Sequence, residues 1–587
     1  MYKEANLMTP KSQLIKETGA TFTPPKLADF ISDKILAHYK PNNEMLKVLD
    51  PACGEGALLA AISRKLILKD IKFELTGFDS NNQFLKTACT NLEFLPNTVS
   101  LLNKDFLEQV GAESKQTNLF NQNELGSSIN GTIDMIIANP PYVRTQILGA
   151  DYAQKISKKF NLKGRVDLYY PFLVAMTYAL KENGLIGVIT SNRYLSTKSG
   201  ISIRKFLKEN FEILEIIDLG DTKLFQAAVL PAIFIGRKKC NAQNRYSPFT
   251  KIYEELNGFN GEITKVPDFY DVLNFKEDGY FETNNKKYKK TSGKIKFINS
   301  KDHYWALLSN QEDKWINRIN ESTKTRISDF FKVRVGIKTT ADKVFIRQNW
   351  NEQKFIPEKK LLKDLISQEN IEPWSISDDK KLSVLYPHFS EGGKKKTIDI
   401  DKYPRAKQYL LEYEEKLKSR KYLIDAGRQW FEIWVPQNPM FWDLPKLVFP
   451  DISSYPRFHF DESKRIVNGN CYWMVAQNPK EINMLLLIQG VANSLLMTKY
   501  HDLMFNNKLY SGRRRYFTQY VEKYPIPDIN SSASKQIISL VKKLNDCTDF
   551  EEKSLKEKLE IKVAESFGVE PVLTLCILPP ITCKHSK

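Results

Sequence analysis

The sequence predicts an α/β fold for its first part, a doubly wound and mostly parallel sheet with helices on both faces. Apolar runs typical of buried strands alternate with helical segments between residues 26 and 236. A glycine-containing loop follows the first of these strands, and polar side chains follow several others. Because open α/β sheets bind ligands at the carboxyl ends of their strands, these polar residues are the candidates for a functional site.

Length and composition narrow the class of protein. At about 100–200 residues per domain, the 587 residues predict two to four domains. The formal net charge of +18 favours a polyanionic partner. Seven scattered cysteines without a Cys-x-x-Cys pair, and six dispersed histidines, indicate reduced thiols in the cytosol and no metal cluster. No run approaches the ~18 apolar residues of a membrane span, and the first twelve residues do not resemble a signal peptide.

The first predicted helix spans residues 26–39 and follows a hydroxyl-rich turn. Pro24 and Pro25 suit the first turn of this helix, because proline has the required φ and lacks only an amide that would be unpaired there. Thr23 precedes them. Its hydroxyl either caps the helix or faces a ligand carboxylate.

Residues 47–61 predict a strand, a glycine loop and a helix. Asp50 ends the strand, and Gly54 and Gly56 let the backbone approach a ligand closely. The loop lacks the third glycine of the dinucleotide fingerprint and the Gly-Lys-Ser/Thr of a Walker loop. An acidic strand end before such a loop suits a cation that carries an amino acid and a nucleoside, which is S-adenosylmethionine.

The next two predicted strands are also followed by acids. Asp79 ends one strand, where an acid typically accepts hydrogen bonds from ribose hydroxyls. Asp105 follows the other and suits an adenine amino group, with Phe106 against the ring. One acid of this kind is more often a solvated loop carboxylate. Acids at successive strand ends favour a ligand site.

The sequence Asn139-Pro140-Pro141-Tyr142 follows the buried strand at residues 134–138. Two prolines make this turn stiff and remove its amide donors. An aromatic amine such as N6 of adenine is a poor nucleophile, because its lone pair is delocalised into the ring. The Asn139 side-chain oxygen and the Pro140 carbonyl would accept hydrogen bonds from this amine and favour a more nucleophilic nitrogen. Tyr142 would stack on the base.

In this order, the motifs resemble those of the gamma-type, TaqI-like adenine-N6 DNA methyltransferases. The resemblance implies a class I S-adenosylmethionine-dependent methyltransferase fold over residues 1–240, with seven strands of which the last is antiparallel. It implies that one hydroxyl, one carboxylate and two backbone groups hold the methionine end of the cofactor: Thr23, Asp50, Ala52 and Gly54.

The resemblance also assigns the rest of the cofactor and the target base. It implies Asp79 on the ribose, and Asp105, Phe106 and Phe172 around the cofactor adenine. It implies three residues that hold the flipped base: Asn139, Pro140 and Tyr142.

One feature departs from the family. A second aromatic residue often sandwiches the base, but this sequence has Ser199-Gly200 at that position. Tyr194 is near in sequence and is the candidate substitute.

The second half predicts three further regions. Residues 241–325 are rich in lysine and asparagine and read as a linker with an inserted element. Residues 326–530 read as an α+β target-recognition domain, with strands near 447–450, 458–460 and 471–474 and a helix from 479 to 496. Residues 531–587 read as a helical tail.

A cationic stretch with aromatic neighbours lies inside the predicted recognition domain. Such stretches suit contact with DNA phosphates and bases. Its candidates are Arg513, Arg514, Arg515 and Tyr516.

The expected function is methylation of adenine N6 in double-stranded DNA with S-adenosylmethionine, without a metal. The expected protein is a bacterial cytoplasmic monomer that a cognate restriction endonuclease accompanies only functionally. Three alternatives remain. The substrate could be an RNA base or a glutamine amide, or the fold could be an inactive DNA-binding protein. Asp451 with Glu462 and Lys464 also superficially fits a fused magnesium-dependent nuclease.

Overall fold

The computed structural model divides the chain into two compact units, residues 1–310 with 504–506 and residues 311–503 with 507–587. It describes residues 22–572 except 42–43, 96–97, 112–128, 143–148, 163–166, 223, 226–229, 240–244, 256–261, 298–303, 378–380, 506–508, 510–511 and 548–550. The polar segment at residues 113–130, whose composition is typical of a loop, lies almost wholly outside the described residues.

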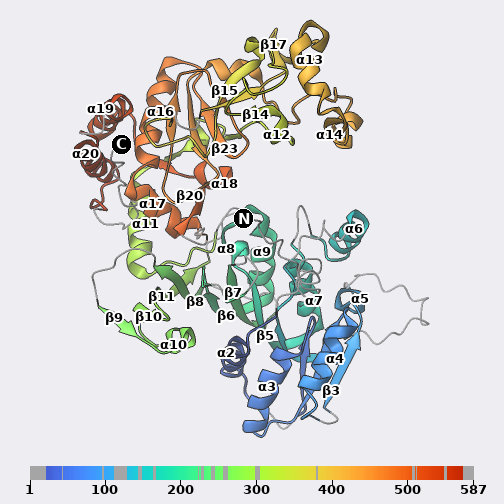
Figure 1. Cartoon of the computed structure of the whole chain (residues 1–587). Coiled ribbons are helices and arrows are strands. Elements are labelled where there is room, and N and C mark those ends of the chain that lie inside the picture. Colours follow the sequence, from blue (N-terminus) through green and yellow to red (C-terminus); the bar gives the residue numbers. More distant parts are fainter. Residues whose placement is uncertain are drawn as a thin grey trace, which may run out of the picture. The chain divides into compact units, whose positions relative to one another are not determined.

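An 11-stranded sheet organises the first unit, in the order β3-β2-β1-β4-β5-β7-β6-β8-β11-β10-β9 (Figure 1). The first five strands pair in parallel, whereas β7 lies antiparallel between β5 and β6. The predicted seven-stranded methyltransferase sheet is therefore confirmed. Its strands are β1 (Leu46–Asp50), β2 (Phe73–Asp79), β3 (Val99–Asn103), β4 (Ile133–Ala138), β5 (Leu180–Ser191), β6 (Phe211–Asp218) and β7 (Pro231–Lys238).

Two separate hydrophobic cores cover the two faces of this sheet. On β4, Met135 and Ile137 belong to one core, whereas Ile136 and Ala138 belong to the other. A strand alternates its side chains between faces, so an apolar run with no polar interruption requires cover on both. One face carries α2 (Pro25–Leu36), α3 (Ala57–Leu68) and α4 (Asn82–Asn91), and the other carries α5 (Phe106–Gln109), α6 (Ala150–Lys159), α7 (Tyr169–Ala179) and α9 (Ile201–Asn210), with the short α8 (Arg193–Ser196) before α9.

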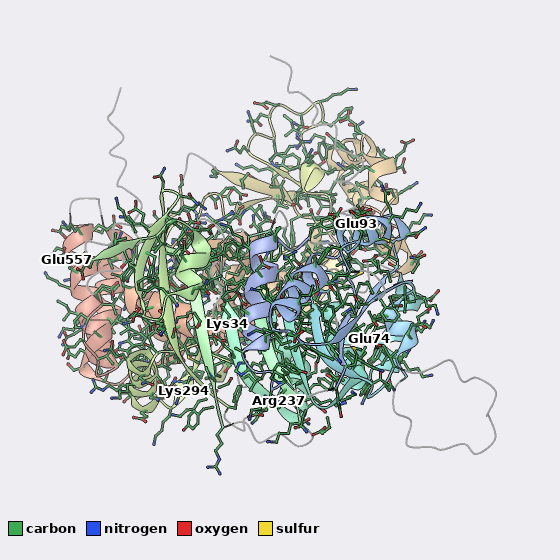
Figure 2. The ribbon with its side chains drawn as sticks, turned by 90° about the horizontal axis from the view of Figure 1, so that it is seen from below. Lys34, Glu74, Glu93, Arg237, Lys294 and Glu557 are labelled. Carbon is green, nitrogen blue, oxygen red and sulfur yellow. The ribbon has the colours of Figure 1, made fainter. Side chains whose placement is uncertain are left out.

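Polar contacts supplement the packing of α2 on the sheet. Lys34 pairs with Glu215 of β6 at 2.9 Å, and Arg237 of β7 donates to the His38 carbonyl at 3.1 Å. Figure 2 labels Lys34 and Arg237 among the side chains of this region. Both interactions join α2 to the last strands of the seven-stranded sheet.

The segment predicted as a linker at 241–325 continues the sheet instead. β8 pairs in parallel with β6, and β11 pairs antiparallel with β8 over ten residues. On β11, Tyr288 and Ile295 are buried while Lys289 and Lys294 are exposed, so the lysines are the solvent side of a strand. The predicted boundary at 240 is therefore wrong. The added elements are β8 (Tyr246–Glu255), β9 (Ile263–Lys265), α10 (Phe269–Asn274), β10 (Gly279–Thr283) and β11 (Lys286–Lys296).

The second unit has the predicted α+β character. Two four-stranded sheets share one hydrophobic core, in the orders β13-β23-β19-β21 and β14-β16-β15-β22. Their strands are β13 (Arg334–Val335), β14 (Ile346–Arg347), β15 (Leu362–Ile366), β16 (Leu382–Leu385), β19 (Lys446–Pro450), β21 (His459–Asp461), β22 (Ile466–Val467) and β23 (Cys471–Val475). The strands predicted near 447–450, 458–460 and 471–474 are confirmed.

Smaller strand pairs and helices complete this unit. The pairs are β12 (Thr325–Arg326) with β25 (Pro525–Ile526), β17 (His388–Glu391) with β18 (Lys394–Thr397), and β20 (Ile452–Ser453) with β24 (Arg514–Arg515). The helices are α11 (Asn310–Ser322), α12 (Asp342–Phe345), α13 (Pro404–Leu411), α14 (Glu414–Lys418), α15 (Lys421–Asp425), α16 (Pro479–Ala492), α17 (Leu495–Phe505), α18 (Thr518–Val521), α19 (Ser532–Asp546) and α20 (Glu552–Ser566).

The described part of the predicted C-terminal tail is largely helical, in α19 and α20, and belongs to the second unit. A β-carbon on Gly490 of α16 would lie 2.7 Å from Ile537 and 2.8 Å from Val541, both on α19. Gly490 therefore permits a close approach of the two helices. Among the described residues, no single helix is long and apolar enough to cross a membrane. α16 and α17 reach that length and composition only as a pair bent by 75°.

Candidate active site

The polar residues predicted at strand ends lie along one edge of the sheet. β3, β2, β1 and β4 are adjacent and parallel, so their carboxyl ends meet at the same edge. Asp50 and Asp79 are the last residues of β1 and β2, and Asn139 directly follows β4. Asp105 follows β3 by two residues. This is the edge at which open α/β sheets bind their ligands.

Two carboxylates hold the glycine loop after β1. Asp50 is 1% exposed and accepts from the Ala52 amide at 3.1 Å. Asp79 accepts from the Gly54 amide at 2.9 Å and from the Asn81 amide at 2.8 Å. Gly54 itself has φ +52°, which other residues rarely adopt. The predicted cofactor residues thus form two hydrogen-bonded pairs on the same loop, Asp50 with Ala52 and Asp79 with Gly54.

Burial makes this group electrostatically strained. The pKa of the Asp50 carboxyl is raised to about 8, mainly by burial and in part by the nearby charge of Asp79. Burial also raises the pKa of Asp79, against the hydrogen bonds from the two amides. Two buried carboxyl groups side by side favour a ligand that brings positive charge or hydroxyl donors. The pair therefore fits the ammonium and ribose groups of S-adenosylmethionine.

The aromatic residues predicted for the cofactor adenine lie together. Phe106 of α5 and Phe172 of α7 stack with centroids 6.0 Å apart and an interplanar angle of 20°. A base between two rings needs about 7 Å, two contact distances of about 3.5 Å. In this structure the rings therefore contact each other, and the expected arrangement on opposite sides of one adenine requires them to separate.

Asp105 has two protein partners. Its carboxylate caps α5 by accepting from the Leu107 amide at 2.9 Å, and it accepts from the Tyr152 hydroxyl at 2.9 Å. Tyr152 belongs to α6, a helix in the lysine-rich segment that follows Tyr142, for which no helix was predicted from the sequence. The apolar residues Tyr152, Ile156 and Phe160 are spaced at i, i+4 and i+8, and this spacing could have identified the helix from the sequence. All three side chains are partly or fully buried.

Two hydroxyl groups orient the Asn139 side chain, which is 8% exposed. Tyr142 donates to Asn139 Oδ1 at 2.6 Å, and Asn139 Nδ2 donates to Thr23 Oγ1 at 3.0 Å. Thr23 does not cap α2, whose N-cap is Pro24 and has no side-chain hydrogen bond. The hydroxyl of Thr23 instead contacts a residue 116 positions away, a contact that the sequence did not reveal.

The aromatic residues near Tyr142 come from α7. The Tyr142 and Tyr169 rings make an edge contact, with centroids 6.4 Å apart.

Tyr194, the predicted second wall of the base pocket, is 1% exposed and packs against Trp305, with ring centroids 6.0 Å apart. In this structure its ring lies in the core and presents no face to a base. A β-carbon on Gly200 would lie 2.4 Å from the Tyr194 carbonyl oxygen, so this backbone excludes any side chain there.

The predicted DNA-binding stretch divides into outward and inward residues. Arg514 is 3% exposed and forms a bidentate ion pair with Asp502, at 2.6 and 2.7 Å. Tyr516 is 1% exposed, whereas Arg513 is exposed and Arg515 is half-buried. β24 pairs with β20, and the side chains of a strand alternate between its faces. Arg514 and Tyr516 therefore contribute to the packing of this unit, and of the predicted DNA-binding residues in this stretch the structure exposes Arg513 and, in part, Arg515.

The described residues contain no group of three histidine, cysteine or acidic side chains that could hold a metal ion. Asp451 lies at the end of β19 and Glu462 directly follows β21, both strands of the same sheet. The nuclease interpretation thus relies on residues inside the recognition fold.

Comparisons with known proteins agree with this architecture. Residues 55–225 match the Eco57I restriction-modification methylase family, and residues 393–526 match the TaqI-like C-terminal specificity domain. The solved structure of the type IIL restriction-modification enzyme MmeI in complex with DNA shares the fold, with a TM-score of 0.62 and 16% identity. That match covers 97% of this chain and 78% of MmeI. Fold and strand-end site together define a class I S-adenosylmethionine-dependent methyltransferase with an appended specificity domain.

Two curated relatives span nearly the whole chain. Type II methyltransferase M.BanIII of Aneurinibacillus aneurinilyticus is 43% identical over 583 residues, which is 96% of this chain and 99% of that protein. Type II methyltransferase M.BstVI of Geobacillus stearothermophilus is 26% identical over 549 residues, 88% of this chain and 91% of that protein. The chain therefore belongs to the TaqI-like DNA methyltransferases of type II restriction-modification systems.

Proposed function

We propose that the chain methylates the exocyclic N6 amine of adenine in double-stranded DNA. The observation that carries this proposal is the oriented amide of Asn139, at the carboxyl end of β4 and in line with the acidic ends of β1 and β2. Methylation protects host DNA from a cognate restriction endonuclease, and the chain acts as a monomer.

Asn139 supplies the acceptor for the target amine. An amide oxygen can accept two hydrogen bonds, so the Tyr142 hydroxyl on Oδ1 does not by itself exclude one from the substrate. The bond from Nδ2 to Thr23 fixes which end of the amide faces the base. With the Pro140 carbonyl as second acceptor, the amine hydrogens are held and its lone pair is directed at the methyl donor.

Tyr142 holds the plane of the base. Its hydroxyl is tied to Asn139, and its ring rests edge-on against Tyr169. Stacking on an aromatic ring contributes about 1–3 kcal/mol per base. An adenine inside a duplex cannot reach this site, so it must leave the helix, which costs a few kcal/mol.

Bound S-adenosylmethionine supplies an electrophilic methyl group on a sulfonium. The residues that hold it are Asp50 and Asp79 with the loop amides of Ala52 and Gly54, and Thr23 from the adjacent turn. No side chain in this set is a nucleophile towards the base. The chain binds, orients and shields two substrates, and the amine attacks the methyl group directly.

The decisive experiment combines plasmid DNA with S-adenosylmethionine labelled in the methyl group, followed by sequencing that detects N6-methyladenine. Asn139→Ala should reduce turnover by at least about 10²-fold, the effect of losing one precisely aimed hydrogen-bonding group. Cofactor binding, measured by calorimetry, should change little.

Asn210→Ala is a matched control in the same unit. Asn210 Nδ2 donates only locally, to the Phe206 carbonyl at 2.8 Å, and its loss should leave turnover unchanged. Full turnover by Asn139→Ala would refute the assignment. A product methylated on cytosine, RNA or protein would refute adenine as the substrate.

A further inference from the structure

Arg334 in the second unit has aromatic neighbours instead of an acidic partner. Its guanidinium carbon lies 5.1 Å from the Phe441 ring centroid and 5.7 Å from that of Trp473. The guanidinium donates to the Lys332 carbonyl at 3.1 Å, and no ion pair joins it to a described carboxylate. Burial lowers its pKa, with no carboxylate to oppose that effect. A guanidinium carries five N–H donors, so most of the donors of Arg334 have no acceptor among the described residues and remain open to solvent or a ligand.

The backbone under Arg334 is rigid. The Val335 carbonyl accepts from the Trp473 indole at 3.1 Å and from the Gln437 amide at 2.8 Å. A β-carbon on the next residue, Gly336, would lie 2.0 Å from the Asn468 carbonyl oxygen, so the two segments are in direct contact. Arg334 therefore projects from a fixed base, and its two rings restrict the guanidinium further. Little conformational entropy remains to be lost when it binds.

Other arginines of the same unit are satisfied within the protein. Arg514 binds Asp502 through two nitrogens, and Arg428 donates to Glu432 at 2.7 Å and to two backbone carbonyls. Arg420 donates to the carbonyls of Leu417, Thr339 and Trp430. Fold stability thus explains those arginines. Fold stability does not explain why two aromatic rings hold Arg334 while most of its N–H donors have no acceptor in the described part of the protein.

The neighbours of Arg334 along the chain indicate the charge of its partner. Lys332 and Lys338 flank it and are exposed. The whole chain carries a net charge of +18, and the substrate of the family is DNA. A planar fork of N–H donors, with exposed lysines nearby in the sequence, suits the oxygens of a phosphodiester.

We infer that Arg334, clamped by Phe441 and Trp473, is a preformed anchor for a backbone phosphate of the DNA substrate. This inference rests on the proposed function only in that DNA is the substrate. A phosphate contact fixes the position of the protein on the duplex and carries no sequence information. Arg334 therefore contributes affinity and register, and the reading of bases falls to other residues.

Binding of a fluorescein-labelled plasmid fragment, measured by anisotropy between about 50 and 200 mM KCl, tests the inference. Arg334→Ala should weaken binding about tenfold at the lowest salt. It should also reduce the slope of log K against log salt by about 1, because one phosphate contact fewer releases one counterion fewer. A fragment of unrelated sequence should show the same change. Arg334→Lys should keep the slope and lose part of the affinity, since an ammonium retains the charge without the planar fork.

Arg405→Ala is the matched control. Arg405 is an exposed arginine of the same unit whose nearest acid, Glu358, is 3.9 Å away, and its loss should leave the slope unchanged. Thermal unfolding of each variant shows whether it is folded. An unchanged slope for Arg334→Ala would overturn the inference, as would methylation of additional sequences, which indicates base reading. If the wild type makes no N6-methyladenine but its salt slope still depends on Arg334, the proposed function fails and the anchor stands.

Discussion

The carboxyl edge of the first sheet and strand β24 of the second unit present polar side chains in opposite ways. At the carboxyl edge, Asp50 and Asp79 end two parallel strands and Asn139 follows a third, and the three strands are adjacent in the sheet. Arg514 of β24 is buried, whereas Arg513, directly before this strand, is exposed although it carries the same charge. Position at the end of a parallel strand therefore predicts which side chains share a site. A run of charged residues in the sequence does not predict which of them face solvent.

The energetic roles of the buried acids and the buried arginine also differ. Arg514 and Asp502 neutralise each other within the protein. Asp50 and Asp79 are both buried acids with raised pKa values, so ionising both at once is unfavourable until a cationic ligand binds. The first arrangement stabilises the fold, and the second destabilises the free protein at the residues that we propose bind the cofactor.

The largest expected effect is on stability. Arg514→Ala removes the bidentate guanidinium partner of the largely buried Asp502 carboxylate and should lower the free energy of unfolding by about 3–5 kcal/mol. Arg513→Ala should change it by less than about 0.5 kcal/mol. Urea unfolding followed by fluorescence measures both. Replacing the pair together, Arg514→Met with Asp502→Leu, should recover most of the loss, and equal destabilisation by both single variants would remove the distinction between inward and outward arginines.

Asp50→Asn should weaken cofactor binding by about 10²-fold, because it removes a charge that binds the ligand. It should also stabilise the free protein near pH 8. Between about pH 4, where the unfolded carboxyl titrates, and the folded pKa of about 8, the folded state holds a proton that the unfolded chain has lost. Stability of the wild type therefore falls as pH rises through this window, and the variant lacks this dependence.

Calorimetry checks the same residue in a second way. If the cofactor cation favours the ionised form of Asp50, binding at pH 7 releases a proton, and the apparent enthalpy depends on the buffer. Thermal melts of both proteins across the pH window give the stability comparison. Equal proton release by wild type and Asp50→Asn would contradict the assignment of Asp50.

Tyr142→Phe should have the smallest effect, about fivefold on turnover, because it removes one hydrogen bond to Asn139 and keeps the ring. Tyr142→Ala should cost considerably more, since the stacking surface is lost as well. Single-turnover rates with saturating cofactor measure both. Equal losses in the two variants would mean that orienting Asn139, and not stacking, is the main role of Tyr142.

Local patterns were sufficient to predict the first sheet and its strand-end residues. Uninterrupted apolar runs such as 134–138 require cover on both faces, and parallel pairing then brings their ends together. The contact between Thr23 and Asn139 could not be predicted, because it joins segments 116 residues apart. The inward direction of Arg514 depends on the register of β24 with β20, which no local pattern encodes.

Lysine-rich composition concealed the extension of the sheet. β11 contains Lys286, Lys287, Lys289, Lys290, Lys294 and Lys296. Lys290 is buried and donates to the carbonyls of Leu273 and Phe275 near the end of α10, so even this charged side chain has a structural role. Charge density resembles that of a linker in sequence, but pairing with β8 over ten residues makes the segment a strand.

The pairing of β8 with β6 sets where such enzymes can be recombined. A chimera that exchanges the second half at residue 240 would make β6 pair with a foreign β8 at three residues, and a mismatch there would leave backbone groups unpaired at a sheet edge, where strands tend to aggregate. A junction near Asn310, where the first unit ends, keeps all eleven strands with their own sheet. Transplanting a new sequence preference onto this catalytic unit should therefore begin at the start of α11.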